Sequence, residues 1–400
     1  MNKMKIKNPR YRFQEFFNNN WEKIKFKKYI KLYRGSSPRP IQDYLTNDNG
    51  VNWIKIGDTK NSKNYIISSV EEQITKEGAE QSRFVEKGEL ILANSMSYGS
   101  TYELGLNGCI YDGWFVLREY EPSFNKTFLK YQLNSNLLQY QYERLSAGGI
   151  VKNISSDIVY ATKLFHTSEK EQEKIAQCLK AVDDLILLEE EKLEKLKSHK
   201  NGLLQKLFTR DTNMHPQLRF PNYREKLKKT TIKDVCNYSS SSMSLNDINP
   251  KGKYAFYDAN NMIGKINSFA SEKPYITILK DGAGVGRIRL LEGYTNFVGT
   301  MGMITNKNNC TIDFLYYLLD TINFSKYIVG GAIPHIYFKD YSLQDVIIPV
   351  QKKEQQKIAE CLSSIDDLIS AQTEKIETLK QHKKGLLQGL FPSIEEVENE

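Results

Sequence analysis

The run DGAGVGR, from Asp281 to Arg287, is the first place in this sequence to look for phosphate-binding chemistry. Its glycines follow the pattern G-x-G-x-G, whereas a dinucleotide-binding loop needs G-x-G-x-x-G and a P-loop needs G-x-x-x-x-G-K. Both of these loops open a helix, whose first N–H groups hold the phosphate, but β-rich sequence follows Arg287. The run therefore predicts a tight turn. FVGTMG, Phe297–Gly302, also predicts a turn rather than a methyl-donor loop, because no doubly wound pattern surrounds it.

Acidic and histidine side chains that could serve catalysis or metal binding do not form a set. Asp183–Asp184 and Asp366–Asp367 are adjacent on predicted helices, so their side chains point about 100° apart and are expected to be solvated. The sequence contains no Pro-Pro pair, which the base-gripping tetrapeptide of an adenine methyltransferase requires, and no carboxylate cluster that would hold a nuclease metal ion. We therefore predict no catalytic residue, no metal site and a chain that is not an enzyme by itself. The histidines are dispersed, at positions 166, 199, 215, 335 and 382.

Length and composition indicate a soluble chain with more than one folded domain. The 400 residues are 40% hydrophobic and 26% charged, and no apolar run approaches the about 18 residues that a membrane helix needs. The five cysteines include no CxxC pair, so we expect reduced thiols in a cytoplasm.

Positive charge is concentrated at the beginning of the chain. Residues 1–40 contain twelve Lys and Arg against Glu15 and Glu22, and the whole chain carries a net charge of +8. Such a stretch suits a polyanion, with nucleic acid as the first candidate. The alternative is a solvated terminal segment without a binding role.

One long segment occurs twice. Residues 171–208 and 354–391 align without gaps at an offset of 183, and 24 of the 38 positions are identical. The first copy reads EQEKIAQCLKAVDDLILLEEEKLEKLKSHKNGLLQKLF and the second EQQKIAECLSSIDDLISAQTEKIETLKQHKKGLLQGLF. This is an internal duplication, which organises the whole chain.

Each copy is predicted to be one long helix. Neither contains proline, and apolar residues recur every seven positions, the spacing that packs helices as a coiled coil. A helix of this length extends about 55–60 Å, so two copies packed on each other would make a rigid spacer. The polar positions Glu189/Gln372 and Lys200/Lys383 either fix the register or are solvated breaks. The predicted seam consists of Leu179, Val182, Ile186, Leu193 and Leu196 in the first copy, and Leu362, Ile365, Ile369, Ile376 and Leu379 in the second.

A shorter repeat precedes each copy, since NPRYRF at 8–13 resembles HPQLRF at 215–220. The chain thus reads as two modules, each with a P-x-x-R-F motif, a globular segment and a long helix. The globular segments mix β-rich runs such as ELILANS and YITILKDG with two predicted helices, 126–149 and 311–331, each ending at a double glycine. The predicted fold is therefore α+β, with two globular domains and two long helices.

These residues resemble the specificity subunits of type I restriction-modification enzymes. The resemblance is carried by both E-Q-x-K-I-A helices with their L-x-x-H-K-x-G-L-L-Q endings, and by GSSPRP (35–40), WIKIGD (53–58), ITKEGAEQSR (74–83) and SAGGIVKNIS (146–155). It implies two target recognition domains that each read one half of a split, asymmetric double-stranded DNA site. It also implies an antiparallel helix pair with pseudo-twofold symmetry that docks two modification subunits. The modification subunits would bind S-adenosylmethionine, and ATP and Mg would also be bound by partner subunits, including restriction subunits, rather than by this chain. The complex would be located in a bacterial or archaeal cytoplasm.

The resemblance sets the expected domain boundaries. We expect a first recognition domain over 1–167, a spacer helix over 168–210, a linker and second recognition domain over 211–350, a second helix over 351–392 and an acidic tail over 393–400. The second domain has no clear counterpart of GSSPRP or WIKIGD, although Ser239–Ser244 and Tyr254–Asn261 could take similar places. Two other functions stay open at this point: a coiled-coil assembly protein without a DNA role, and a self-contained methyltransferase or nuclease.

Candidate DNA contacts are polar or basic residues in loops, where phosphate and base-edge contacts are usually made. Ser36-Ser37-Pro38-Arg39-Pro40 is the strongest segment, because its prolines stiffen a polar loop. The candidates are Ser36, Ser37, Arg39, Lys60, Asn94, Ser95, Tyr98, Lys152 and Asn153 in the first domain, and Ser240, Ser241, Asn260, Asn261, Lys280, Arg287 and His335 in the second.

Overall fold

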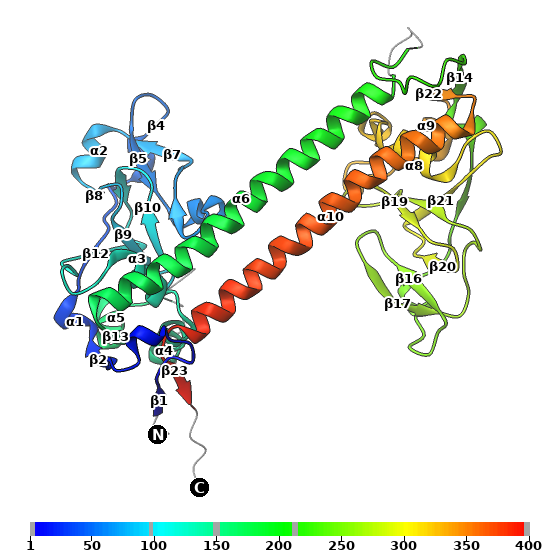
Figure 1. The fold of residues 1–400 in the computed structure, drawn as a ribbon. Coiled ribbons are helices and arrows are strands. Elements are labelled where there is room, and N and C mark those ends of the chain that lie inside the picture. Colours follow the sequence, from blue (N-terminus) through cyan, green and yellow to red (C-terminus); the bar gives the residue numbers. More distant parts are fainter. Residues whose placement is uncertain (1–4, 96–98, 147–152, 210–214, 396–400) are drawn as a thin grey trace. The chain divides into compact units, whose positions relative to one another are not determined.

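The computed structural model describes residues 5–95, 99–146, 153–209 and 215–395. The chain divides into two compact units (Figure 1). The first unit comprises Met1–Glu191 and Glu374–Glu400, and the second comprises Lys192–Thr373. Each long helix therefore contributes one part to each unit.

Two five-stranded sheets form the centre of the first unit. Their strands are β3 (Lys31–Arg34), β4 (Leu45–Thr46), β5 (Val51–Ile54), β6 (Ile66–Ile67), β7 (Glu72–Ile74), β8 (Arg83–Val85), β9 (Leu90–Ala93), β10 (Thr101–Leu104), β11 (Gly108–Ile110) and β12 (Trp114–Arg118). One sheet has the order β3-β12-β9-β10-β6 and the other β4-β7-β5-β11-β8. Neighbouring strands are antiparallel, except that β6 runs parallel to β10 and β5 parallel to β11.

The central strand β9 is buried on both faces. Alternate side chains of a strand point to opposite faces, so Leu90 and Leu92 pack in the core beneath the helices, while Ile91 and Ala93 pack in the core between the sheets. This explains why the sequence here is a continuous apolar run rather than an alternating one. The helices of this unit are α1 (Phe26–Tyr29), α2 (Lys76–Glu80), α3 (Lys126–Leu133), α4 (Asn136–Ser146) and α5 (Ser156–Ala161).

The single helix predicted over 126–149 is wrong, because the chain breaks between α3 and α4. The side chain of Asn134 causes the break: its Nδ2 donates hydrogen bonds to the carbonyl oxygens of Lys130 and Thr101. These bonds satisfy the end of α3 and tie it to β10. Two short strands, β2 (Glu22–Lys25) and β13 (Lys163–His166), pair antiparallel, and β13 leads the chain from α5 into the first long helix.

The second unit has a four-stranded and a three-stranded sheet. Its strands are β14 (Leu227–Thr231), β15 (Cys236–Ser240), β16 (Tyr254–Tyr257), β17 (Met262–Ile266), β18 (Tyr275–Leu279), β19 (Ile288–Leu291), β20 (Thr295–Phe297), β21 (Met301–Asn306) and β22 (Asp345–Pro349). The sheets have the orders β15-β21-β18-β19 and β17-β16-β20, and β14 pairs with β22 separately. The helices are α7 (Ile232–Val235), α8 (Ile312–Asp320) and α9 (Phe338–Tyr341). The helix predicted to reach Gly331 therefore ends earlier, at Asp320.

The two units share one topology. The strands β15, β21, β18 and β19 repeat the pairing of β3, β12, β9 and β10, and β16 runs parallel to β20 as β5 does to β11. The counterparts missing at the sequence level therefore exist: Ser239–Ser244 lie at the end of β15 as GSSPRP follows β3, and Tyr254–Asn261 take the place of WIKIGD. Two backbone hydrogen bonds recur at equivalent steps, Asn94 to Gly113 with Lys280 to Thr300, and Ile154 to Asn94 with Ile336 to Lys280.

The long helices α6 (Glu169–Leu207) and α10 (Lys352–Gly389) pack antiparallel within each unit. In the first unit, Asp183 pairs with Lys383 and Glu189 with Lys375, so residue numbers rise along one helix as they fall along the other. In the second unit Lys200 pairs with Asp366. The predicted mixed fold with a packed helix pair is confirmed. The seam residues Leu179, Ile186, Leu362, Ile365 and Ile376 are buried, and Val182, Leu193, Leu196, Ile369 and Leu379 are half-buried.

The first and last described strands pair with each other. β1 (Lys5–Lys7) runs antiparallel to β23 (Ser393–Glu395), and both strands belong to the first unit. All five cysteines are free thiols. Within the described parts of the chain, no helix is long and apolar enough to cross a membrane.

Candidate nucleic-acid interface

Three segments of the first unit converge where strands of the β3-β12-β9-β10-β6 sheet begin or end. Ser36 and Ser37 follow β3, Asn94 and Ser95 follow β9, and the turn around Asp112 precedes β12. The Ser37 hydroxyl donates a 3.0 Å hydrogen bond to Asp112 Oδ1, and Asn94 Nδ2 donates one of 3.0 Å to the Asp112 carbonyl oxygen. Ser95 Oγ lies 3.4 Å from the hydroxyl oxygen of Tyr111 in the same turn. We call Ser36, Ser37, Asn94, Ser95, Asp112 and Asn153 the first cluster.

The members of the first cluster differ in their freedom to meet a ligand. Asn94 is 4% exposed and its amide is already bonded to the turn, so it holds the cluster together rather than facing solvent. Ser36 Oγ donates to the carbonyl oxygen of Gln81, and Ser36 and Ser37 are half-buried. Asn153 is exposed and is joined to the cluster because the next residue, Ile154, donates its N–H to the Asn94 carbonyl oxygen.

The other candidates of this unit lie away from these bonds. Arg39 is exposed at the end of the Ser-Pro loop. Lys60 is exposed on a 3-10 helix, Ile56–Asn61, just before Asn64, whose side chain donates to the backbone of α6 at Asp183. Two further candidates, Tyr98 and Lys152, lie outside the described residues.

The second unit brings together a set of segments at equivalent places. Ser240 ends β15 and Ser241 follows it, Lys280 and Asp281 follow β18, and the turn at Thr300 precedes β21. The N–H groups of Lys280 and Asp281 both donate to the Thr300 carbonyl oxygen, and Ile336 donates to the carbonyl oxygen of Lys280. We call Ser240, Ser241, Lys280, Asp281, Arg287, Thr300 and His335 the second cluster.

Charge distinguishes the second cluster from the first. Lys280 Nζ lies 3.0 Å from Asp281 Oδ2, and His335 Nδ1 lies 3.6 Å from Asp281 Oδ1, so one carboxylate faces two nitrogen groups. Arg287 adds an exposed guanidinium. Burial, together with the charge of Asp281, raises the pKa of Tyr238 on β15, which keeps its hydroxyl protonated as a donor beside the cluster.

The glycine run forms the predicted tight turn between β18 and β19. Gly282, Gly284 and Gly286 have φ angles of +96°, +84° and +90°, which residues with a Cβ rarely adopt. At Gly286 a Cβ would also lie 2.6 Å from Cβ of Phe324. The turn closes with hydrogen bonds from the Gly286 N–H to the Leu279 carbonyl oxygen and from the Leu279 N–H to the Arg287 carbonyl oxygen, so Arg287 lies opposite Leu279, the residue before Lys280.

Asn260 and Asn261 form hydrogen bonds within the turn in which they lie, and Ser241 bonds to a neighbouring strand. The N–H groups of Asn260 and Asn261 donate to Asp258 Oδ1 in the turn between β16 and β17, where both residues are exposed. Ser241 Oγ donates to the carbonyl oxygen of Phe297, so this hydroxyl helps to attach the end of β15 to β20.

Several residues of the two clusters were not predicted. Asp112 lies in a turn without a distinctive motif, and its importance depends on a strand pairing that joins distant segments. Asp281 precedes the glycine run, where the sequence pattern indicates a turn and nothing more. Among the described residues, no three His, Cys, Asp or Glu side chains are grouped to hold a metal ion.

The expectation that the paired aspartates of the helices are solvated is wrong for Asp183 and Asp366. The hydroxyl of Tyr131 donates a 2.6 Å hydrogen bond to Asp183, and that of Tyr317 donates one of 2.8 Å to Asp366. The seam lysines complete these contacts, so Lys200 and Lys383 are paired residues rather than solvated breaks: Lys383 lies 2.5 Å from Asp183, and Lys200 lies 2.7 Å from Asp366. Periodicity alone could not reveal this, because the tyrosines come from the globular domains.

Comparison with known proteins agrees with this architecture. Residues 224–381 match the family described as type I restriction modification DNA specificity domain. The type I restriction enzyme MjaVIII specificity subunit of Methanocaldococcus jannaschii is 23% identical over 424 aligned positions, covering 95% of this chain and 94% of its own. A second relative from that organism is 23% identical over 291 residues, covering 67% of this chain and 66% of its own length.

The fold has a counterpart among solved structures as well. The crystal structure of a type I restriction-modification system S subunit from M. genitalium superimposes with a TM-score of 0.62 at 18% identity, covering 97% of this chain and all of the other. The duplicated helices, the two domains of one topology and these matches agree: the chain is similar over nearly its whole length to the specificity subunits of type I restriction-modification systems, and its residues 224–381 match their DNA specificity domain.

Proposed function

We propose that this chain recognises a split DNA sequence for a type I restriction-modification complex. The first cluster would read one half of the site and the second cluster the other half. The recognition role comes from the family, and the bipartite reading is our inference for this chain.

One observation carries the proposal: two domains of the same topology present different side chains at equivalent places. Asn94 occupies the position of Lys280, and Asn153 that of His335, as their backbone hydrogen bonds show. Equivalent positions on one scaffold suit one docking geometry, and different side chains suit different bases. The site is therefore proposed to be asymmetric.

The duplicated helices provide a proposed docking surface for two copies of one modification subunit. Packing inside the chain can explain why buried residues are identical in the two copies. It does not explain the identical residues that are exposed. Leu185 and Leu368 are equivalent leucines with exposures of 40% and 55%. At Gly202 and Gly385, another equivalent pair, a Cβ would meet nothing within 4 Å. A surface repeated in this way suits a partner that binds twice.

Chemistry is proposed to lie in the partners. The modification subunits would bind S-adenosylmethionine and transfer the methyl group to adenine, and restriction subunits would use ATP and Mg. This chain would provide recognition of the DNA sequence and would not act as an enzyme by itself.

The experiment compares the purified chain with the chain bound to its modification subunits. The complex should bind one split duplex with an affinity that falls steeply as salt rises, because phosphate contacts release counterions. With S-adenosylmethionine it should methylate that duplex, whereas the chain alone should not. Methyl transfer by the isolated chain, or equal binding of all duplexes by the complex, would contradict the proposal.

A further inference from the structure

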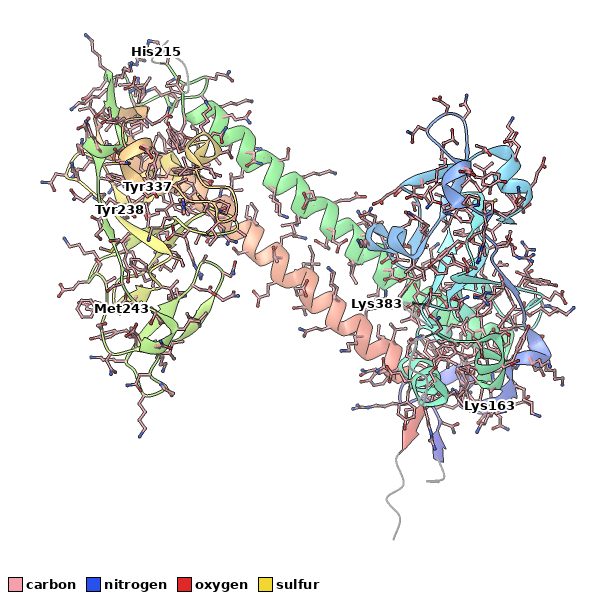
Figure 2. The ribbon with its side chains drawn as sticks, turned by 180° about the vertical axis from the view of Figure 1, so that it is seen from behind. Lys163, His215, Tyr238, Met243, Tyr337 and Lys383 are labelled. Atoms are coloured by element: carbon pink, nitrogen blue, oxygen red, sulfur yellow. The ribbon has the colours of Figure 1, made fainter. Side chains whose placement is uncertain are left out.

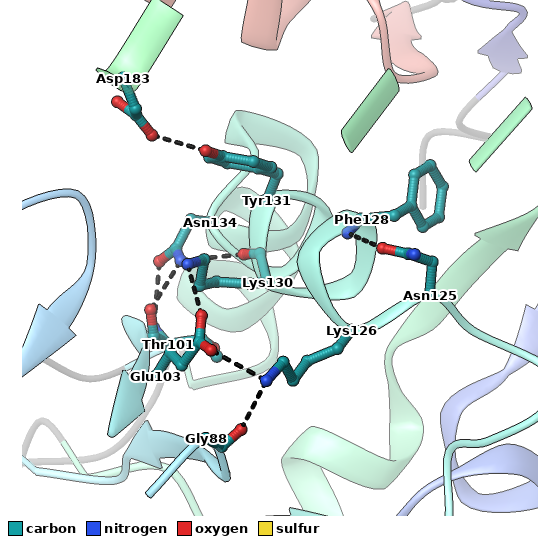
Figure 3. Close-up of polar contacts among 10 residues, drawn as sticks. All are labelled: Gly88, Thr101, Glu103, Asn125, Lys126, Phe128, Lys130, Tyr131, Asn134 and Asp183. Atoms are coloured by element: carbon teal, nitrogen blue, oxygen red, sulfur yellow. Dashed lines mark hydrogen bonds and ion pairs between the residues drawn. The ribbon is translucent and has the colours of Figure 1, made fainter. Parts of the chain in front are cut away.

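Asp183 joins the first recognition domain to both long helices. It is 1% exposed, and its Oδ2 accepts the hydrogen bond from Tyr131 on α3 (Figure 3). Its Oδ1 lies 2.5 Å from Nζ of Lys383 on α10, and this ammonium nitrogen is also 5.8 Å from the centre of the Tyr131 ring. Burial and the bond to Asp183 raise the pKa of Tyr131, so its hydroxyl remains a donor. We call Tyr131, Asp183 and Lys383 the first latch.

The second unit repeats this arrangement with the helices exchanged. Asp366 on α10 accepts from Tyr317 on α8, and its Oδ1 lies 2.7 Å from Nζ of Lys200 on α6. Lys200 also lies 5.4 Å from the centre of the Tyr317 ring, and the pKa of Tyr317 is raised by burial and by Asp366. We call Tyr317, Asp366 and Lys200 the second latch. The first latch can be followed in two views: Figure 2 labels Lys383, and Figure 3 labels Tyr131 with Asp183.

Each domain helix is also attached near its beginning. The N–H of Asn125, at the start of α3, donates a 2.9 Å hydrogen bond to Oε1 of Gln172 on α6. Gln172 and Asp183 are about 16 Å apart along α6, at 1.5 Å per residue. In the second unit, Thr311 donates in the same way to Gln355, also at 2.9 Å. Two attachment points at different heights fix the direction of the domain helix against the long helices.

The domain helix is in turn fixed to the sheet that carries the recognition cluster. Glu103 on β10 lies 2.9 Å from both Lys126 and Lys130 of α3 (Figure 3). β10 pairs with β9, whose end leads to Asn94 in the first cluster. A continuous series of contacts therefore runs from the cluster through the sheet and α3 to Asp183.

We propose that Asp183 and Asp366 are positioning residues for DNA recognition, each controlling how well one half-site is read. This inference rests on the proposed function. Replacing Asp183 by Asn removes the charge that holds the half-buried Lys383 and weakens the acceptor for Tyr131, so α3 loses one attachment point. The neighbouring aspartates at 184 and 367 are exposed and provide matched controls.

The test measures the affinity of the complex with its modification subunits for three duplexes: the intact site, and the site with either half scrambled. The ratio of Kd for a scrambled duplex to Kd for the intact one states how strongly that half is read. We expect Asp183→Asn to lower this ratio at least tenfold for one half-site and to leave the other within twofold. Asp366→Asn should give the opposite pattern. Asp184→Asn and Asp367→Asn should leave both ratios unchanged.

Tyr131→Phe and Tyr317→Phe keep the test informative if an Asn variant fails to fold, because each removes a single hydroxyl. They should lower the same ratios as the corresponding Asn variants, by a smaller factor. Ratios that fall equally for both half-sites would overturn the positioning role. Unchanged ratios with a lower Tm would also overturn it, because a purely structural residue changes the folded fraction and not the ratios. A wild-type complex that is indifferent to either half-site contradicts the proposed function instead.

Discussion

The guanidinium of Arg12 and the carboxylate of Glu171 form a bidentate ion pair, with Nε 2.7 Å from Oε1 and Nη2 2.9 Å from Oε2. Arg219 and Glu354 repeat this pair at the same distances in the second unit. The two P-x-x-R-F motifs thus have the same structural role, because each supplies the arginine that fastens its module to the first turn of a long helix. The glutamates are buried, with side-chain exposures of 0% and 2%.

Replacing Arg12 by Met should lower the free energy of unfolding of the first unit by about 3–5 kcal/mol, because Glu171 would be left buried without its cation. All three tryptophans, at 21, 53 and 114, belong to the first unit, so their fluorescence reports its unfolding in urea. Arg10 is exposed, and Arg10→Met should change the value by less than about 0.5 kcal/mol. Equal effects of the two substitutions would contradict this role of the motif.

The stability of the first unit should depend on pH through Glu103. Burial alone would raise the pKa of Glu103, but hydrogen bonds and charge from Lys130 and Lys126 outweigh burial and hold the pKa below its ordinary value of 4.5. The ionised form is therefore favoured in the folded state. Its contribution is complete above the unfolded-state pKa and is lost as pH falls through the lowered folded-state pKa.

The corresponding measurement compares the wild-type chain with Glu103→Gln in urea, at pH 7 and again below about pH 4. The difference in unfolding free energy should be large at pH 7 and should shrink in acid. Glu80→Gln, at an exposed position of α2, serves as the control and should show a small difference at both pH values. A Glu103→Gln difference that stays constant with pH would show that the lysines do not favour the ionised carboxylate.

Substitutions at Gly202 and Gly385 should affect the stability of the chain and its assembly with modification subunits in opposite directions. Both lie inside long helices with open space around them, so replacement by Ala should raise the unfolding free energy of the chain by up to about 1 kcal/mol. If the modification subunits pack closely there, the same variants should bind those subunits more weakly. Titration of labelled modification subunit checks the second effect. Tighter or unchanged assembly would place the docking surface elsewhere.

Arg287→Ala should weaken recognition of one half-site. A guanidinium that reads a guanine contributes about 1–3 kcal/mol of base discrimination, and loss of a phosphate contact lowers the salt slope by about 1. Binding of the complex to single-base variants of the site, at two salt concentrations, distinguishes these two roles. Arg224→Ala, at an exposed position before β14, is the control and should alter neither quantity.

The repeating features of the fold could be predicted from the sequence, because they depend on local periodicity. The heptad rows predict two long helices, and α6 and α10 follow those rows. The glycine run predicts a turn, and its three positive φ angles agree. The two domain helices were predicted too long, because their ends depend on tertiary contacts: the side chain of Asn134 bonds to Thr101, a residue 33 positions away.

The polar contacts that organise the site could not be predicted for the same reason. Tyr131 and Asp183 are separated by 52 residues and meet through the packing of α3 on α6. The equivalence of Asn94 and Lys280 depends on strand pairing, since their neighbouring sequences have little in common. Short motifs located the loops that carry candidates such as Ser37 and Arg287. They did not indicate that the carboxylates of Asp112 and Asp281 organise the two clusters.

We propose that two unlike clusters on one scaffold read the two halves of a split DNA site. Methylome sequencing tests it most directly, in cells with the gene for this chain, without it, and with residues 229–350 replaced by the corresponding segment of another specificity subunit. We predict a split, asymmetric adenine-methylated motif that disappears without the gene, and a motif with one half unchanged and the other half new after the exchange. A motif that persists without this chain, or one that changes in both halves after the exchange, would contradict the claim.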